Sequence, residues 1–205
     1  MTKIKEIRHH FRQMRQSFSP IEHTLAAHAL VENEPYHLQK VHQHIGLYLA
    51  YDGEIDPFFL RKAIWALGKY CYLPTIATDS KTLGFMPYTP NSEMKTNSFG
   101  INEPSVDENL VVKPECLDLV FVPLVAFHES GYRVGMGGGY YDRSFAFLKN
   151  GAKKPFLIGL AYQAQKLTTD QMNIVRQSWD IPMQAIVTEE GVYKRDSNEL
   201  LVNEI

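Results

Sequence analysis

The segment at residues 131–143, GYRVGMGGGYYDR, combines a glycine-rich loop with charged residues on both sides. Four glycines fall within five positions (135, 137, 138 and 139), which removes side chains and lets backbone N–H groups approach a ligand. A helix is expected to start at about Tyr140, and a helix start favours an anion. Arg133 can add positive charge, and Asp142 can bind a metal ion or cap the helix. The segment therefore predicts an anion site next to a carboxylate.

Neither of two common phosphate motifs occurs in the chain. There is no GxxxxGK[ST], and GxGxxG fails because Tyr140 occupies the sixth position. The GxSxG nucleophile elbow, which carries the catalytic serine of α/β-hydrolases, is also absent. A tight turn that needs glycines for its shape is the alternative interpretation of the loop.

Positive charges follow one face of the predicted N-terminal helix. Lys5, Arg8, Arg12 and Arg15 are spaced by 3, 4 and 3 residues beside an apolar stripe. This pattern is compatible with anion binding, and also with an ordinary solvated helix face.

A carboxylate, Glu54, follows a predicted buried strand in the segment YDGEIDP. At a strand end it can accept two hydrogen bonds from neighbouring N–H groups of a heterocycle. The alternative is a loop charge or a cap for the next helix, for which Asp56 competes.

The histidines and cysteines do not form a recognisable metal site. His42 and His44 can share a strand face, but no third ligand stands at metal spacing. Cys71 and Cys116 form no CxxC pair and are predicted to be core thiols, which suits a reducing compartment.

Composition limits the class of protein. The chain has 205 residues, 44% of them hydrophobic, and a net charge of −2, which predicts one globular domain and no general nucleic-acid role. The charged N-terminus has no apolar signal core, and the longest apolar run, at 119–127, contains Pro123 and is too short to cross a membrane. A cytoplasmic protein without membrane contact is expected.

The elements that must position these residues follow from periodicity and from turn residues. Helices are predicted from the N-terminus to about Gln16, from Pro20 (capped by Ser19) to about Glu34 before Pro35, from Asp56 to Gly68, and from about Tyr140. The helix before Gly68 carries Leu60, Ile64 and Leu67 as apolar positions. Strands are predicted at 44–51, 70–76, 82–88, 117–127, 154–162 and 183–189, with a long polar connection at 89–117 that is typical of functional loops.

This alternation predicts the α/β class: a single layered domain over residues 1–205, with a mostly parallel central sheet flanked by helices. Ligands of such sheets usually bind beyond the carboxyl ends of the strands. The glycine loop follows the most buried strand and should lie at that edge.

These segments resemble the 5-formyltetrahydrofolate cyclo-ligase family, also called 5,10-methenyltetrahydrofolate synthetases. The resemblance rests on FVPLVAF (121–127) with the glycine-loop segment, YLAYDGEID (48–56), FGINEP (99–104), WDIPMQAIVTE (179–189) and the helix with Arg8 and Arg15. These segments span nearly the whole chain in the order found in the family.

The resemblance implies an enzyme that uses ATP and Mg²⁺ to convert 5-formyltetrahydrofolate, free or polyglutamylated, to 5,10-methenyltetrahydrofolate, with release of ADP and phosphate. It implies Arg133 and Tyr141 as catalytic residues and Asp142 as the metal ligand. The implied ATP contacts are Lys3 or Lys5, Arg8, Arg133, Gly135, Met136, Gly137, Gly138, Gly139, Tyr140 and Tyr141. The implied folate contacts are Leu49, Glu54, Met136, Gly137, Gly138, Gly139 and Tyr140.

Several positions depart from the family pattern. Ile4 stands where the family usually has a lysine, flanked by Lys3 and Lys5, either of which is a candidate for that contact. Met136 replaces a frequent Tyr or Arg, and Gln184 a frequent Asp, although Asp180 is nearby.

Two other functions remain open from the residues alone. A folate- or nucleotide-binding protein without turnover would need Glu54 and the glycine loop but no metal ligand. A sugar-phosphate isomerase or an acyl-CoA transferase would need a base or a nucleophilic Glu, for which Glu54 and Glu103 are candidates.

Overall fold

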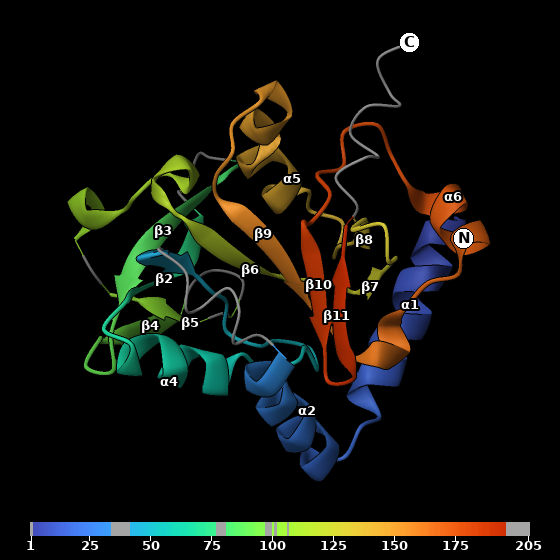
Figure 1. Cartoon of the computed structure of the whole chain (residues 1–205), viewed down its shortest axis with the longest axis horizontal. Helices are drawn as coiled ribbons and strands as arrows, with labels where there is room; N and C mark the ends of the chain where they lie inside the picture. Colours follow the sequence, from blue (N-terminus) through green and yellow to red (C-terminus); the bar gives the residue numbers. More distant parts are fainter. Residues whose placement is uncertain are drawn as a thin grey trace.

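A seven-stranded sheet crosses the middle of the protein, as the computed structural model shows (Figure 1). The structure describes residues 2–33, 42–76, 81–96, 100, 102–105 and 107–195. The strand order is β11-β10-β9-β6-β1-β2-β3, in which the five central strands are parallel and the two edge strands are antiparallel. The strands of this sheet are β1 His44–Gly46, β2 Tyr70–Ile76, β3 Leu83–Tyr88, β6 Leu119–Pro123, β9 Phe156–Leu160, β10 Ala185–Thr188 and β11 Gly191–Lys194. The predicted α/β class with a mostly parallel sheet is confirmed.

The helices agree with the prediction where their start and stop signals are strong. Ser19 and Glu22 form a capping box, in which each side chain accepts a hydrogen bond from the other residue's backbone N–H. The region beyond Asn33, where the second helix was predicted to end, lies outside the described residues. The helices are α1 Lys3–Gln16, α2 Pro20–Asn33, α4 Phe58–Ala66, α5 Tyr140–Ser144 and α6 Thr169–Val175, with 3₁₀ turns η1 Glu108–Leu110, η2 Pro114–Cys116, η3 Ala146–Asn150 and η4 Gln163–Gln165.

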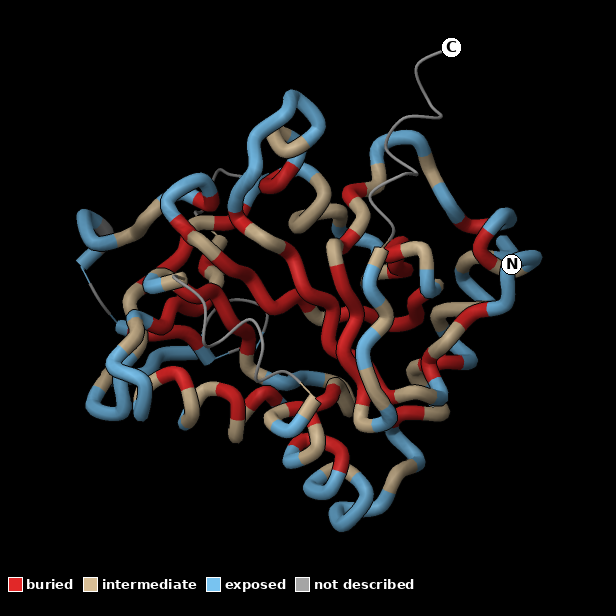
Figure 2. Tube along the Cα trace, in the orientation of Figure 1, coloured by how far each residue is buried: buried red, intermediate tan, exposed pale blue. Residues whose placement is uncertain are grey.

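Alternate residues of β6 fill the two halves of the core. Leu119 and Phe121 pack in a cluster with residues of α2 and α4. Val120 and Val122 point to the opposite face and pack in a cluster that includes residues of α5 and η3. Because a strand presents successive side chains to opposite faces, one apolar strand serves both layers. Figure 2 shows the resulting band of buried backbone through the centre of the molecule.

Beyond the sheet, α1 and α6 pack on a small hairpin formed by β7 Ala126–Phe127 and β8 Arg133–Val134. Phe11 of α1 and Met172 of α6 are buried there with Ala126 and Val134. The packing places α1 next to the glycine loop, which follows β8 directly.

The strand predicted at 117–127 is wrong as one element, because it forms β6 and then leaves the sheet. After Pro123 the carbonyl of Leu124 accepts hydrogen bonds from the side chains of Arg15 and Gln165 rather than from a neighbouring strand. The chain then pairs again as β7 with β8.

The strand predicted at 44–51 is likewise too long. Only residues 44–46 form a strand: all three pair with β2, and Ile45 and Gly46 also pair with β6. Leu47 adds one backbone bond to Tyr72. The hydroxyl of Tyr48 then donates to the carbonyl of Ile55, which closes the segment into a loop. The apolar run reflects burial between layers, which periodicity alone does not distinguish from sheet pairing.

Further expectations are corrected or extended. The connection at 89–117 contains a hairpin of β4 Met94–Thr96 with β5 Asn102–Pro104, as well as η1 and η2. Leu67 is exposed although it has helical spacing, and Cys116 is exposed rather than a core thiol. Cys71 is buried as predicted, and burial raises the pKa of its thiol to about 12. Helix α6 and strand β11 had no counterpart in the predicted elements.

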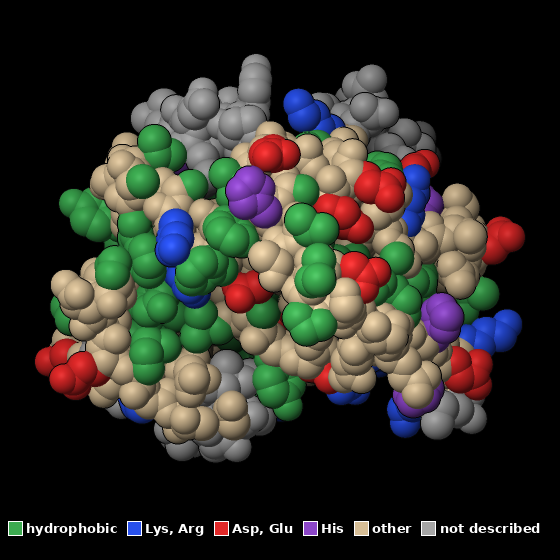
Figure 3. Space-filling view, turned by 90° about the horizontal axis from the view of Figure 1, so that it is seen from below, with side chains coloured by type: hydrophobic (Ala, Val, Ile, Leu, Met, Phe, Trp, Pro, Cys, Tyr) green, Lys and Arg blue, Asp and Glu red, His purple; other side chains and the backbone are tan. Residues whose placement is uncertain are grey.

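In the part of the chain that the structure describes, no helix is long and apolar enough to cross a bilayer. Figure 3 views the molecule from below. Hydrophobic side chains gather there on the left, and Lys and Arg side chains are scattered among acidic and neutral ones. The described residues of this face therefore form no continuous basic surface.

Candidate active site

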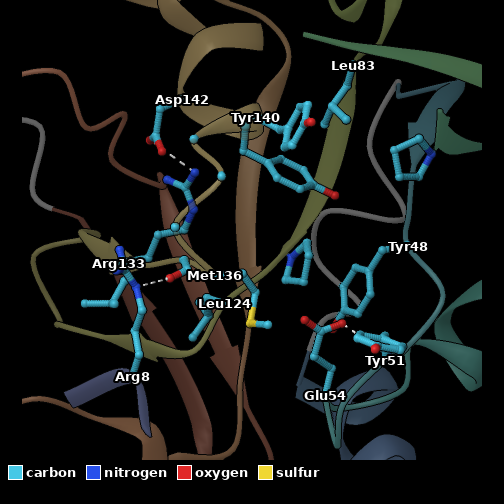
Figure 4. A pocket seen from close by; sticks show the side chains of 18 of the residues that line it. Arg8, Tyr48, Tyr51, Glu54, Leu83, Leu124, Arg133, Met136, Tyr140 and Asp142 are labelled. Carbon is cyan, nitrogen blue, oxygen red and sulfur yellow. Dashed lines mark hydrogen bonds and ion pairs between the residues drawn. The ribbon is translucent and has the colours of Figure 1, made fainter. Parts of the chain in front are cut away.

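A cavity of about 790 Å³ lies at the carboxyl ends of β1, β2 and β6, against the glycine loop. Figure 4 shows Arg8, Arg133 and Asp142 on one side of it and Tyr48, Tyr51 and Glu54 on the other, with Met136 and Leu124 between. The predicted site residues that line it are Arg8, Leu49, Glu54, Arg133, Gly135, Met136, Gly137, Gly138, Gly139, Tyr140, Tyr141 and Asp142. One cavity thus brings together residues from α1, the segment after β1, and the glycine loop.

The glycine loop is held by two arginines. Arg8 donates from Nε to the carbonyl of Gly135 at 2.8 Å, and Arg143 donates to the carbonyl of Gly138 at 2.7 Å. Gly137 has a φ of +102°, and a Cβ atom there would lie 3.3 Å from the Arg8 guanidinium carbon. A side chain at this position would therefore be strained and would crowd Arg8.

The helix after the loop is short. It contains only five residues, Tyr140–Ser144, and begins after Gly139, whose φ is +65°. The aligned peptide dipoles of so short a helix give less charge than the sequence suggested. The groups that could meet an anion here are the loop N–H groups and the guanidinium groups of Arg8 and Arg133, which line the cavity. Burial lowers the pKa of Arg8, although the side chain stays a cation at neutral pH.

Buried Arg133 and half-buried Asp142 form an ion pair that also fixes the loop before β10. Arg133 is 7% exposed, its Nη2 lies 3.1 Å from Asp142 Oδ1, and its Nη1 donates to the carbonyl of Ile181 at 2.9 Å. Asp142 Oδ1 accepts from the backbone N–H of Ile181 at 3.1 Å. Asp180 also lines the cavity; burial raises its pKa, and the nearby charge of Asp142 adds to the rise.

The opposite side is built on a tight turn at residues 51–54. Asp52 and Gly53 both have positive φ, +55° and +74°, which an Asp-Gly pair tolerates better than most sequences. The turn brings Glu54 Oε2 back to the N–H of Tyr51 at 3.2 Å. The carboxylate is thereby directed into the cavity (Figure 4).

Among the acidic groups that line the cavity, Glu54 has the largest shift in pKa. Burial raises its pKa to about 7, against the opposing effects of Arg15 and the N–H of Tyr51. Burial also raises the pKa of the Tyr48 and Tyr141 hydroxyls, and the charge of Glu54 adds to both shifts. Both tyrosines are neutral hydrogen-bond donors at physiological pH.

Some predicted residues do not reach the cavity. Lys3 and Lys5 are exposed, and Ile4 between them lines the cavity instead. Gln184 accepts from the N–H of Leu157 in the sheet. Glu103 pairs with Lys95 and accepts from Thr75, and it is not among the residues that line the cavity, which removes one candidate for a nucleophilic Glu.

Sequence reasoning missed Tyr48, Asp52 and Trp179. Tyr48 and Trp179 line the cavity, and Trp179 is 64% exposed, an unusual exposure for an indole. The exposure of Trp179 could not be inferred from the sequence. Its place next to Asp180, in the segment at 179–189 that resembles the family, could have marked it as a candidate site residue. The role of Asp52 depends on contacts with α1 that no local pattern reveals.

Together the fold and the cavity define an α/β protein in which an arginine-held glycine loop and a separate, largely buried carboxylate line one pocket. The model of the 5-formyltetrahydrofolate cyclo-ligase family matches residues 1–189. The chain is 38% identical over 184 residues to the 5-formyltetrahydrofolate cyclo-ligase of Haemophilus influenzae, covering 89% of this chain and 91% of the relative. It is 36% identical over 151 residues to that of Escherichia coli, covering 73% and 80%.

A solved structure has the same fold. The 5,10-methenyltetrahydrofolate synthetase of Aquifex aeolicus superposes with a TM-score of 0.73 at 28% identity, covering 95% of this chain and 93% of the other. The chain therefore belongs to the 5-formyltetrahydrofolate cyclo-ligase family, as the sequence resemblance indicated.

Proposed function

We propose that this protein converts 5-formyltetrahydrofolate and ATP to 5,10-methenyltetrahydrofolate, ADP and phosphate. The observation that carries the proposal is that one cavity joins the arginine-held glycine loop to the largely buried Glu54. The reaction needs two ligands side by side: the arginines on one side of the cavity suit a triphosphate, and the Glu54 carboxylate on the other suits the N–H groups of a pterin.

The chemistry requires activation of a formamide oxygen, which is otherwise a poor leaving group. The γ-phosphate is transferred to that oxygen, the N10 nitrogen attacks the formyl carbon, and the C–O bond breaks to release phosphate. Such a transfer needs mainly positioning and neutralisation of charge. Arg8, Arg133 and the N–H groups of residues 135–139 would bind the phosphates, and Arg133 would neutralise the charge that develops on the transferred group.

Tyr141 supports this step as a neutral donor. Its ring lies 6.0 Å from the guanidinium carbon of Arg133, and the pKa of its hydroxyl is raised by burial. We assign Tyr140, Tyr141 and Met136 to the boundary at which the γ-phosphate and the formyl group meet. The contact of Lys3 or Lys5 with ATP remains a prediction, because both lie outside the cavity.

On the other side, Glu54 would bind the pterin. An ionised carboxylate can accept two hydrogen bonds from adjacent N–H groups of that heterocycle. Leu49 lines the cavity near the same segment and would contact the ring.

The residues present also fit Mg²⁺. The part of the chain that the structure describes has no group of three or more His, Cys, Asp or Glu suited to a metal ion. Mg²⁺ on a nucleotide needs only one or two protein carboxylates, because phosphates and waters complete its coordination. Asp142 and Asp180 both line the cavity, and Asp142 uses only Oδ1 in its two contacts. When bound, Mg²⁺ would neutralise phosphate charge. The use of Mg²⁺ by this protein is a prediction. A cytoplasmic location, expected from the sequence, is likewise a prediction.

The test is formation of the methenyl product, followed by its absorbance. Purified protein with 5-formyltetrahydrofolate should give product only when both ATP and Mg²⁺ are added. Undiminished turnover in EDTA without nucleotide would refute the cyclo-ligase assignment. Tight folate and ATP binding without any turnover would favour a binding protein instead.

A further inference from the structure

Arg15, in the last turn of α1, is a fully buried cation at 0% exposure. Burying a guanidinium is unfavourable unless its donors are paired. Arg15 donates from Nε to the carbonyl of Asp52 at 2.8 Å, from Nη1 to the carbonyl of Leu124 at 3.1 Å, and from Nη2 to Asp52 Oδ2 at 2.9 Å. It therefore ties α1 to both the 51–54 turn and the bend after β6.

The same Nη2 atom faces the active-site carboxylate. It lies 3.8 Å from Glu54 Oε1 and 3.9 Å from the sulfur of Met136 in the glycine loop. Asp52, which binds this atom, is itself held in place by two other side chains of α1. Arg12 lies 2.6 Å from its carboxylate, and Gln16 donates a hydrogen bond to it. Among the described residues, Arg12 forms an ion pair with Asp52 and none with Glu54, and its side chain is 41% exposed.

The groups around Glu54 differ in their effect on its charge. Tyr48 precedes the turn, Tyr51 and Asp52 belong to it, and Tyr141 comes from α5. Asp52 is a like charge and disfavours an ionised Glu54. Among the described residues, Arg15 is the cation whose charge favours it.

We propose that Arg15 is a positioning residue for catalysis: from α1 it holds the 51–54 turn in place and keeps the Glu54 carboxylate charged and directed at the pterin. Asp52 belongs to the same turn and binds Arg15, but its negative charge disfavours an ionised Glu54. This inference rests on the proposed function for its effect on turnover, but not for its effect on Glu54 itself.

The experiment measures turnover against pH for Arg15→Gln, Arg15→Lys, Asp52→Asn and the control Arg12→Gln. Without the Arg15 charge, Glu54 ionises only at higher pH. We expect Arg15→Gln to raise the KM for 5-formyltetrahydrofolate at least tenfold at pH 7, with recovery toward pH 9 and a smaller change in kcat. On the acid side of the pH profile (the acid limb), turnover rises as Glu54 ionises. Arg15→Lys keeps the positive charge and should leave this limb close to its wild-type pH.

The variants at the partner residues separate charge from packing. Asp52→Asn removes the like charge and should move the acid limb to lower pH, opposite to Arg15→Gln. Arg12→Gln should leave the limb unchanged. An unshifted limb in folded Arg15→Gln, or equal shifts in Arg12→Gln, would overturn the proposal. If Arg15→Gln does not fold, Asp52→Asn still decides, because a shift toward higher pH contradicts the inference.

A second readout does not depend on activity. The ¹³C shift of the Glu54 carboxyl, followed in the ligand-free protein, gives its titration midpoint in each variant. Midpoints that move in opposite directions for the Arg15 and Asp52 variants support the inference even if no cyclo-ligase turnover is found. Absence of turnover in the wild type would count against the proposed function alone.

Discussion

Replacing Glu54 with Gln should stabilise the ligand-free protein at alkaline pH while it weakens folate binding. The pKa of Glu54 is raised from 4.5 to about 7, chiefly by burial. A raised pKa in the folded state means that the unfolded state ionises first, so the free energy of unfolding falls as the pH rises between the two values. Gln has nearly the same shape and carries no charge to bury.

The magnitude follows from the size of the shift. At about 1.36 kcal/mol per pKa unit, ionised Glu54 costs about 3 kcal/mol of folding free energy at pH 8, but only about 1 kcal/mol at pH 5. The advantage of Glu54→Gln should therefore grow by about 2.5 kcal/mol over this range. For a chain of this size that is a relative gain of about 5–10 °C in Tm.

Thermal melts of both proteins at pH 5, 6, 7 and 8 measure this difference. Comparing the two proteins at each pH removes the contributions of Asp180, Glu189 and other groups that titrate in both. Folate should then raise the Tm of the wild type much more than that of the variant, because losing a charged hydrogen-bond pair costs about 1.5–3 kcal/mol, or about 10- to 100-fold in Kd. An equal Tm difference at pH 5 and pH 8 would refute the reasoning about Glu54.

Two further perturbations test the other side of the cavity. Gly135→Ala should leave the Tm within about 1 °C, since a Cβ there meets nothing within 4 Å, yet raise the KM for ATP at least tenfold if phosphate lies against the loop; an unchanged KM would place the phosphates elsewhere. Asp142→Asn keeps an oxygen for Arg133 and Ile181 but loses its charge, so we expect half-maximal turnover to need at least tenfold more Mg²⁺, as a MgCl₂ titration would show; an unchanged requirement would argue against Asp142 as a ligand.

The fold was predictable where local signals and burial agree. Strand β2 at 70–76 and the capped start of α2 at Pro20 were both predicted from their own residues. The errors at 44–51 and 117–127 have one cause: an apolar run reports burial but not the partner of its backbone groups. At Leu124 that partner is the side chain of Arg15, 109 positions away in the chain.

The candidate site shows the same division. The glycine loop, Arg133, Asp142 and Glu54 stand in short segments whose residue types already suggest ligand binding, and the structure brings them to one cavity. Arg8 and Arg15 belonged to a basic stripe for which a solvated helix face was the more common interpretation. Only tertiary contacts distinguish them from Arg12, whose side chain stays 41% exposed.

Through those contacts α1 connects the two sides of the cavity and fixes their relative position. Arg8 and Arg15 are seven residues apart, two turns and about 10.5 Å along a helix, so they lie on nearly the same face. Arg8 fixes the glycine loop through Gly135, and Arg15 fixes the turn that carries Glu54. In a reaction between two bound ligands, the relative placement of their sites contributes directly to the barrier. A helix that is rigid over two turns can set that placement, and this accounts for the buried Arg15 at a position where an apolar residue would be easier to accommodate.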